Sequence, residues 1–306
     1  MPLHIETPLL LSRPLSLIAE RSVWLKFDAL QPAGSFKIRG IGHACEAYRR
    51  RGAQRFISSS GGNAGLAVAY AGRTMGLPVT VVVPETTSET AIKLLRQENA
   101  EVIVHGASWQ EANVLAQALI GAADAFIHPF DDALVWQGHA TLIEEVARTG
   151  LKPDAIVLSV GGGGLLAGVS EGLERHDWGQ VPIVAVETAG AASFRAALAA
   201  GQPVSLERIT SIAATLGAKR VCDQAVAWAK RRPIESLVVT DQDALTACER
   251  FLDDHRVLVE PACGASLAVV YERAPVLEQF DTILVVVCGG ATASLDQIRR
   301  WRAEML

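Results

Sequence analysis

Aromatic residues are scarce in this chain of 306 residues, since Phe, Trp and Tyr together make up 6% of it. The sequence also has no block of basic residues, and its formal net charge at pH 7 is -5. Nucleic acids and anionic membranes are bound largely through clustered Lys and Arg, so neither is an expected partner. No apolar run reaches the about 18 residues that indicate a membrane-spanning helix.

Cysteine is sparse as well, and the five cysteines are scattered at positions 45, 222, 248, 263 and 288. None forms a Cys-x-x-Cys pair, which argues against the usual zinc and thioredoxin-like sites. Scattered thiols of this kind favour a reducing compartment. The first segment, MPLHIETPLLLSRPLS, contains Glu6 and lacks the basic start and the long apolar core of a secretory signal. We therefore expect a cytoplasmic protein.

Half of the residues are hydrophobic and 20% are charged, which is typical of a globular protein with a sizeable core. Apolar, β-branched runs alternate along the chain with segments of helical periodicity. The runs lack polar–apolar alternation, as expected for strands that are covered on both faces. The expected strands are 54–59, 79–83, 101–104, 125–128, 155–160, 181–186 and 282–287, and the expected helices are 62–75, 89–98, 109–121 and 138–149. This order predicts an α/β fold with parallel sheets.

The expected strands divide into two groups along the chain. Four strand–helix units fall within residues 36–133, which we expect to form a small domain. Residues 1–35 and 134–306 would then form a large domain in which the small one is inserted. Two open parallel sheets that meet at a cleft leave room for a ligand between them.

One lysine has unusual neighbours, because the stretch PAGSFKIRG places Lys37 between Phe36 and Ile38. Burial in apolar surroundings disfavours the charged form of an amine and lowers its pKa. A neutral amine can attack a carbonyl carbon and form a Schiff base. Lys37 is therefore a candidate for covalent chemistry.

Glycine-rich turns follow three of the expected strands, at residues 58–67, 159–168 and 285–294. Ligands bind beyond the carboxyl ends of parallel strands, so these turns are candidates for a shared site. The first turn, SSSGGNAGLA, opens a helix whose free N–H groups attract a carboxylate or a phosphate. The second turn, SVGGGGLLAG, lets successive N–H groups wrap a phosphate. The third, VVVCGGATAS, places Cys288 at the end of its strand.

Pyridoxal phosphate has both an aldehyde for a lysine and a phosphate for a glycine turn. In that hypothesis Asn63 would contact the ring hydroxyl, and Cys288 would face the pyridine nitrogen. A second hypothesis stays open, because Gly162-x-Gly164-x-x-Ala167 matches a permissive dinucleotide fingerprint and Glu187 ends the next strand. An NAD-dependent oxidoreductase would leave Lys37 without a role.

The motifs GSFKIRG, SSSGGNAG, SVGGGGLLAGV and VCGGATAS occur in the order and spacing of the fold-type II pyridoxal-phosphate enzymes. With PFDDALVWQGHATLIEE and VEPACGASLAVVY, the chain most resembles the L-serine dehydratase/L-threonine deaminase group. The resemblance implies a tryptophan synthase β-like fold with the cofactor in the cleft between two domains. It also implies a homodimer.

The resemblance assigns roles to particular residues. It implies that Lys37 is the Schiff-base lysine and that Ser60 assists a proton relay. The cofactor would be bound by Phe36, Lys37, Asn63, Gly161, Gly162, Gly163, Gly164, Leu165 and Cys288. The substrate carboxylate would be bound by Ser60, Gly61, Asn63 and Ala64. A monovalent cation such as potassium would be bound by Gly161, Glu187, Ala191, Leu216 and Ala218, although the Glu187 carboxylate could instead cap the turn that follows it.

The implied reaction is the β-elimination of L-serine to pyruvate and ammonia, and of L-threonine to 2-oxobutanoate. Cys288 favours this group, because related β-replacement enzymes and biosynthetic deaminases have Ser or Thr at that position. Serine racemases have a serine where this chain has Gly61, so racemisation is expected to be minor. Thr215 stands where relatives tend to have a smaller residue against the ring. β-Replacement and a catalytically silent amino-acid-binding protein remain alternatives.

Overall fold

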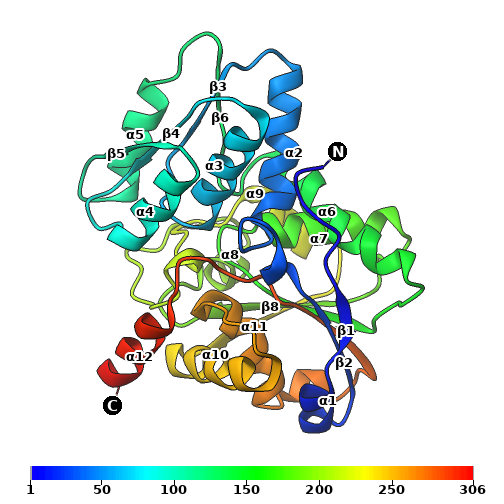
Figure 1. The fold of residues 1–306 in the computed structure, drawn as a ribbon. Helices are drawn as coiled ribbons and strands as arrows, with labels where there is room; N and C mark the ends of the chain where they lie inside the picture. Colours follow the sequence, from blue (N-terminus) through cyan, green and yellow to red (C-terminus); the bar gives the residue numbers. More distant parts are fainter. Residues whose placement is uncertain (1, 306) are drawn as a thin grey trace.

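Ten strands form two separate sheets in the computed structural model, which describes residues 2–305 (Figure 1). The smaller sheet has the order β5-β4-β3-β6, and all of its neighbours are parallel. Its strands are β3 (Arg55–Ser58), β4 (Val79–Val83), β5 (Glu101–Val104) and β6 (Asp124–Phe126). The helices between Lys37 and Ala118 are α2 (Lys37–Arg50), α3 (Asn63–Met75), α4 (Glu89–Gln97) and α5 (Trp109–Ala118). We call this sheet with α2 to α5 the four-stranded unit.

The larger sheet has the order β1-β2-β10-β7-β8-β9, and it is parallel except for the edge strand β1. Its strands are β1 (Leu9–Leu11), β2 (Ser22–Lys26), β7 (Ala155–Ser159), β8 (Ile183–Thr188), β9 (Ile234–Val239) and β10 (Thr282–Val286). Its helices are α1 (Arg13–Ala19), α6 (Ala133–Arg148), α7 (Gly164–Arg175), α8 (Ser193–Ala200), α9 (Asp223–Ala229), α10 (Asp241–His255), α11 (Pro261–Tyr271) and α12 (Leu295–Glu304). Short 3-10 turns lie at Asp28–Leu30, Ala214–Leu216 and Pro275–Leu277. We call this part the six-stranded unit.

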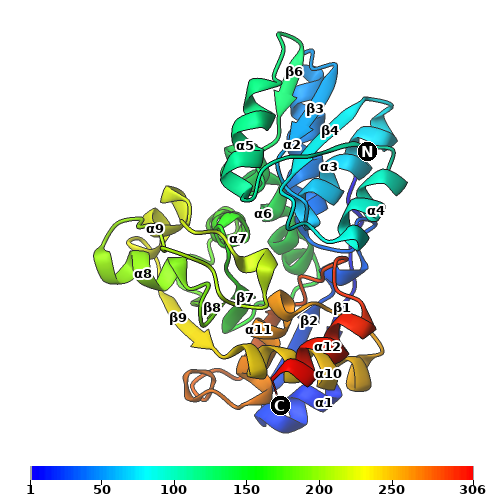
Figure 2. The same cartoon turned by 90° about the vertical axis from the view of Figure 1, so that its left-hand side faces the viewer.

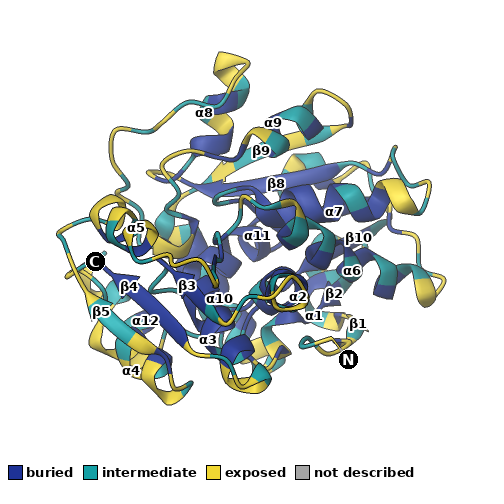
Figure 3. Ribbon diagram, turned by 90° about the horizontal axis from the view of Figure 1, so that it is seen from above, coloured by how far each residue is buried: buried dark blue, intermediate teal, exposed yellow. Residues whose placement is uncertain are grey.

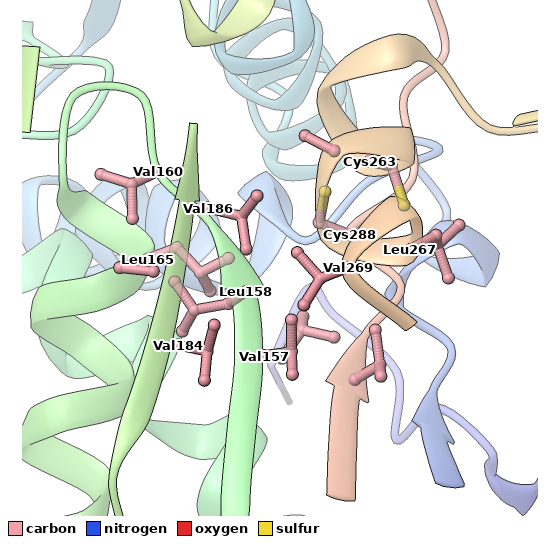
Figure 4. Packing of buried hydrophobic residues seen from close by; sticks show 14 of the residues in the cluster. Val157, Leu158, Val160, Leu165, Val184, Val186, Cys263, Leu267, Val269 and Cys288 are labelled. Atoms are coloured by element: carbon pink, nitrogen blue, oxygen red, sulfur yellow. The ribbon is translucent and has the colours of Figure 1, made fainter. Parts of the chain in front are cut away.

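Helices cover both faces of the central strands, as the sequence predicted. Every residue of β4, β7 and β8 is buried (Figure 3). Figure 4 shows how side chains such as Val157, Val184 and Val269 pack between β7, β8 and α11. Each fully buried Val or Leu side chain contributes about 1.5–3 kcal/mol to folding, so these layers hold the strand ends in fixed positions.

The edges of the larger sheet differ from the expectation. β1, β2 and β9 were not expected, and β1 pairs with β2 antiparallel. Each strand has partly exposed residues, and β9 is not fully buried at any position, so these strands lack the continuous buried runs of the central strands. Helix α6 begins at Ala133 rather than at 138, because the Asp132 side chain accepts a hydrogen bond from the N–H of Leu134 and caps the helix there.

The two units meet along one flank, where α2 packs against α6 (Figure 2). All strands of the four-stranded unit lie between residues 55 and 126. On that ground we propose the domain boundaries expected from the sequence, a small domain at 36–133 and a large domain at 1–35 and 134–306. Among the described residues we find no helix with the length and hydrophobicity of a membrane-spanning segment.

Candidate active site

One pocket brings together residues from both units. It lies where the turns after β7 and β10 face the starts of α2 and α3. Every cofactor-binding residue expected from the sequence lines it: Phe36, Lys37, Asn63, Gly161, Gly162, Gly163, Gly164, Leu165 and Cys288. Lining residues that the sequence did not single out as site residues include Phe130, Ser159, Val160, Leu166, Glu260, Ala262 and Gly289. Thr215 and Leu216 complete the wall.

Lys37 is the first residue of α2, and its side chain is partly exposed to the pocket. Nζ donates a hydrogen bond to the carbonyl oxygen of Pro129 at 2.7 Å and lies 5.2 Å from the centre of the Phe36 ring. Among the described residues no carboxylate forms an ion pair with it. Burial therefore lowers its pKa from 10.5 to about 8, although the nearby Glu260 carboxylate acts in the opposite direction. A substantial fraction of this amine is neutral near physiological pH.

The helix start that carries Lys37 is fixed by a buried ion network around Arg39. The guanidinium of Arg39 is fully buried and forms two bidentate pairs, one with Asp28 at 2.7 and 2.9 Å and one with Glu145 at 2.6 and 2.7 Å. Lys26 also pairs with Glu145, so two cations balance two anions. Such a network adds little net stability, but each member has few alternative positions. It therefore holds the first turn of α2 against β2 and α6.

The turn from Gly161 to Gly164 connects β7 to α7 and has the geometry of an anion site. Gly163 has φ +89°, a conformation that side chains other than glycine rarely adopt. A Cβ at Gly162 would lie 2.3 Å from the Phe130 ring, so glycine is required there for space. Helix α7 begins at Gly164, and its first N–H groups have no partners within the helix. This cradle fits the phosphate of pyridoxal phosphate.

The turn expected to bind the substrate carboxylate lies between β3 and the start of α3. The Ser60 hydroxyl accepts a long hydrogen bond from the N–H of Gly62 at 3.4 Å. A Cβ on Gly61 would lie 2.8 Å from Cγ2 of Thr87, so Thr87 occupies the space that a side chain at position 61 would need. Asn63 lines the pocket, whereas Ser60, Gly61 and Ala64 lie beside it and do not line it.

Cys288 lies in the turn after β10 and lines the pocket, next to Cys263 of α11 (Figure 4). A hydrogen bond with the Cys263 thiol and burial both raise the pKa of Cys288 well above its usual value. The thiol is therefore neutral. It can exchange a hydrogen bond with a ring nitrogen but is a poor nucleophile.

Glu260 was not identified from the sequence, although it lies in the pocket wall and is almost fully buried. Its carboxylate accepts hydrogen bonds from Asn63, Thr215 and Thr292. Burial raises its pKa, and the three hydrogen bonds oppose that shift. Glu260 lies in the motif VEPACGASLAVVY, but the resemblance assigned it no role, and the Glu-Pro pair that opens α11 indicates a helix start rather than a site.

Glu187, expected to bind a cation, is fully buried at the end of β8. Its carboxylate accepts the N–H groups of Phe194 and Arg195 at 2.7 and 2.8 Å, so it caps the first turn of α8. Burial raises its pKa to about 7. A ribose could not reach this carboxylate, which removes the acidic residue needed by the dinucleotide hypothesis.

The other residues of the expected cation site are main-chain contributors. A Cβ on Gly161 would lie 2.9 Å from Cα of Leu216, so these two backbones are in contact. The N–H of Ala218 donates to the carbonyl oxygen of Leu216, and that of Ala191 to the carbonyl oxygen of Thr188. Within residues 2–305 we find no cluster of three or more His, Cys, Asp or Glu side chains that could hold a metal.

Comparisons with known proteins agree with this pocket. Residues 1–289 match the family model for pyridoxal-phosphate dependent enzymes. The chain is 48% identical to human L-serine dehydratase/L-threonine deaminase, over 99% of this chain and 96% of that protein. It is 45% identical to the L-serine dehydratase of Dictyostelium discoideum, over 97% and 91% of the two chains. The crystal structure of an L-serine ammonia-lyase from Rhizomucor miehei superposes with a TM-score of 0.95 at 36% identity, covering 100% of both chains. The chain therefore belongs to the family of pyridoxal-phosphate dependent enzymes.

Proposed function

We propose that this chain is an ammonia-lyase that converts L-serine to pyruvate and ammonia, and L-threonine to 2-oxobutanoate and ammonia. The observation that carries the proposal is the position of Lys37, an amine with a lowered pKa that shares one pocket with the Gly161–Gly164 turn and Cys288. The names of the human, Dictyostelium and Rhizomucor relatives support the same substrate class.

The residues of the pocket divide the binding of the cofactor between them. The N–H groups of Gly161 to Gly164 would hold the phosphate, and Phe36 would pack against the pyridine ring. Asn63 would contact the ring hydroxyl and Cys288 the ring nitrogen. When bound, pyridoxal phosphate supplies an aldehyde for an amine and a ring that withdraws electrons from the α-carbon.

Three groups of this chain would act on the amino acid. The turn from Ser60 to Ala64 would hold the substrate carboxylate through the free N–H groups at the start of α3. The neutral amine of Lys37 would remove the α-proton, and the β-hydroxyl would leave as water after taking up a proton, with the Ser60 hydroxyl assisting the relay. Because the base is held beside one carbon atom, the proton transfer becomes effectively unimolecular.

The residues around Gly61 disfavour racemisation. A racemase needs a proton donor on the opposite face of the α-carbon, and Gly61 has none. Thr87, which packs over Gly61, closes the space in which a serine side chain would lie. The neutral thiol of Cys288 would leave the ring nitrogen largely unprotonated, which favours elimination coupled to proton removal over a long-lived carbanion.

A monovalent cation such as potassium, a homodimeric state and a cytoplasmic location are further parts of the proposal. The cation is supported by Glu187, a buried carboxylate that no basic side chain pairs with in the described residues. Gly161 and Leu216, whose backbones are in contact with each other, would offer carbonyl oxygens, which are the ligands that hard cations prefer. The proposal of a homodimer is based on the family resemblance. The proposal of a cytoplasmic location is based on the scattered cysteines, which form no Cys-x-x-Cys pair.

The purified protein tests the proposal directly. We expect a violet absorbance band from the lysine-bound cofactor, and pyruvate and ammonia in equal amounts when L-serine is added. Lys37→Ala should abolish both the band and turnover, whereas Lys93→Ala, a control on the exposed face of α4, should change neither. Activity in the Lys37→Ala variant would refute the proposed role. Ligand binding without ammonia release would indicate a silent relative, and nicotinamide fluorescence would indicate the oxidoreductase.

A further inference from the structure

The carboxylate of Glu260 is the centre of a hydrogen-bond cluster behind the cofactor pocket. Oε1 accepts from Asn63 Nδ2 at 2.7 Å and from the Thr215 hydroxyl at 2.5 Å, and Oε2 accepts from the Thr292 hydroxyl at 3.0 Å. Glu260 occupies the N-cap position of α11 but does not cap that helix with its side chain. Its carboxylate instead accepts hydrogen bonds from three other segments: the start of α3, the 3-10 turn at Ala214–Leu216 and the turn after β10.

A glycine makes the approach of one of these segments possible. Gly290 has φ +134°, and a Cβ there would lie 2.1 Å from Cδ of Glu260. The turn after β10 can reach the carboxylate only because this residue has no side chain. The same turn contributes Thr292 on one side and Cys288 on the other.

The cluster also joins the two units of the fold. Asn63 belongs to α3 of the four-stranded unit, whereas Glu260 and its two threonine partners belong to the six-stranded unit. Asn63 Oδ1 accepts the N–H of Ala291 at 3.0 Å. An ionised carboxylate only accepts hydrogen bonds, so the amide nitrogen of Asn63 must face Glu260 and its oxygen must face Ala291. One N–H of the amide remains available for another acceptor.

We propose that Glu260 is a positioning residue that orients the Asn63 amide so that its remaining N–H can donate to the ring hydroxyl of pyridoxal phosphate. The same contact closes the four-stranded unit on the six-stranded unit at the pocket. Thr215, which is exposed and lines the pocket, also has a role here, because its hydroxyl donates to the same oxygen of Glu260. The inference rests on the proposed function for the cofactor and does not depend on which amino acid is the substrate.

Glu260→Gln separates orientation from charge. The glutamine oxygen can accept from Asn63 and Thr215, and its amide nitrogen can donate to the Thr292 hydroxyl, which is also an acceptor. This variant keeps the orientation of Asn63 and loses the negative charge. Glu260→Ala loses both.

Thr292→Val is the sharper variant, because Thr292 is not among the residues that line the pocket in the described part of the chain. This variant removes one hydrogen bond of Glu260 and leaves every residue that lines the pocket in place. Tyr271→Phe is the matched control, since it removes a hydroxyl–carboxylate hydrogen bond of 2.8 Å to Asp254 at the other end of α11.

The experiment measures the dissociation constant of pyridoxal phosphate by titrating the cofactor-free protein, and amide hydrogen exchange at the start of α3 in the cofactor-free protein. Loss of a hydrogen bond to a charged group weakens binding by about ten- to hundredfold, and we expect that range for Glu260→Ala and the lower end for Thr292→Val. In both variants the amide hydrogens at the start of α3 should exchange faster than in the original protein. Glu260→Gln should bind within about threefold of the original protein, and Tyr271→Phe should bind equally well.

Unchanged cofactor binding in Thr292→Val would overturn the proposal, even if Glu260→Ala does not fold. A Glu260→Gln variant that binds as weakly as Glu260→Ala would also overturn it, because charge and not orientation would then be decisive. Neither readout uses an amino-acid substrate. If the proposed lyase activity were wrong, cofactor binding would still decide the role of Glu260.

Discussion

The pKa of Lys37 makes the rate of cofactor attachment a direct test of the pocket. An amine with pKa 10.5 is about one part in a thousand neutral at pH 7.5, whereas one with pKa about 8 is about one quarter neutral. Attack on an aldehyde needs the neutral amine, so the difference corresponds to about a 200-fold faster reaction at this pH. The sequence motif predicts which lysine reacts, whereas the about 200-fold faster attachment follows from the burial of its amine in the folded pocket.

The assay follows violet absorbance after mixing cofactor-free protein with pyridoxal phosphate at about pH 6 to about pH 10. We expect the second-order rate constant to rise about tenfold per pH unit at low pH and to level off above pH 8, with a midpoint close to the pKa of Lys37. Glu260→Gln provides an internal check, because the Glu260 carboxylate raises the pKa of Lys37. Its removal should move the midpoint to lower pH.

The same shift predicts an effect on stability. The unfolded chain binds the Lys37 proton more tightly than the folded chain, so the buried lysine destabilises the cofactor-free protein at neutral pH. A shift from 10.5 to about 8 corresponds to at most about 3 kcal/mol, and partial exposure of the side chain reduces that value. Lys37→Met should therefore raise the free energy of unfolding at pH 7. The advantage should fade as pH rises from about 8 to about 10.5, because the folded and unfolded forms of the original protein then both lose the proton.

Two results would refute this reasoning. One is an attachment rate that still rises tenfold per unit above about pH 9, which would show an ordinary lysine. The other is a Lys37→Met protein that is no more stable than the original at pH 7. Urea denaturation of both cofactor-free proteins across the pH range supplies the second measurement.

Three further predictions concern groups around the pocket. Arg39→Met removes the cation from two buried bidentate pairs and leaves Asp28 and Glu145 short of positive charge, so we expect a loss of about 3–5 kcal/mol in urea denaturation. A loss below about 1 kcal/mol would contradict the proposed anchoring of α2. Potassium should raise the melting temperature of the original protein and not that of Glu187→Gln, and an equal effect on both would exclude Glu187 as a ligand. Gly61→Ser should lower turnover because of the contact with Thr87, and Thr87→Ala should restore it in the double variant; no restoration would place the defect elsewhere.

The sequence predicted the interior of the fold better than its edges. The central strands were recognisable because burial on both faces leaves a continuous apolar run, as in VTVVV of β4. β9 has the residues IESLVV with several partly exposed positions, and that pattern is shared by many loops and amphipathic segments. The start of α6 was missed for a different reason, since the cap at Asp132 lies within a segment, HPFDD, that reads as a loop.

For the site, motifs predicted the residues that supply backbone groups and the lysine, and missed those that act through contacts between distant segments. Gly161 to Gly164 can be recognised locally, because a run of glycines has few other uses. Glu260 and Thr292 lie 32 positions apart, and Glu260 and Asn63 lie 197 apart. No local pattern encodes such a pair, because the hydrogen bonds exist only after both sheets have formed.

Lys37 shows how a correct prediction can rest on an incomplete cause. Its lowered pKa was expected from the apolar neighbours Phe36 and Ile38. In the fold, Ile38 is fully buried in the core of the four-stranded unit, whereas Lys37 opens into the pocket. Phe36 does lie near the amine, but the burial that lowers the pKa comes from the whole pocket wall, and the Glu260 carboxylate, which opposes that shift, is more than 180 positions away in the sequence. The chemistry of this amine is therefore a property of the assembled pocket, and removing the charge of Glu260 should shift its pKa more than a change at Ile38 that preserves the helix.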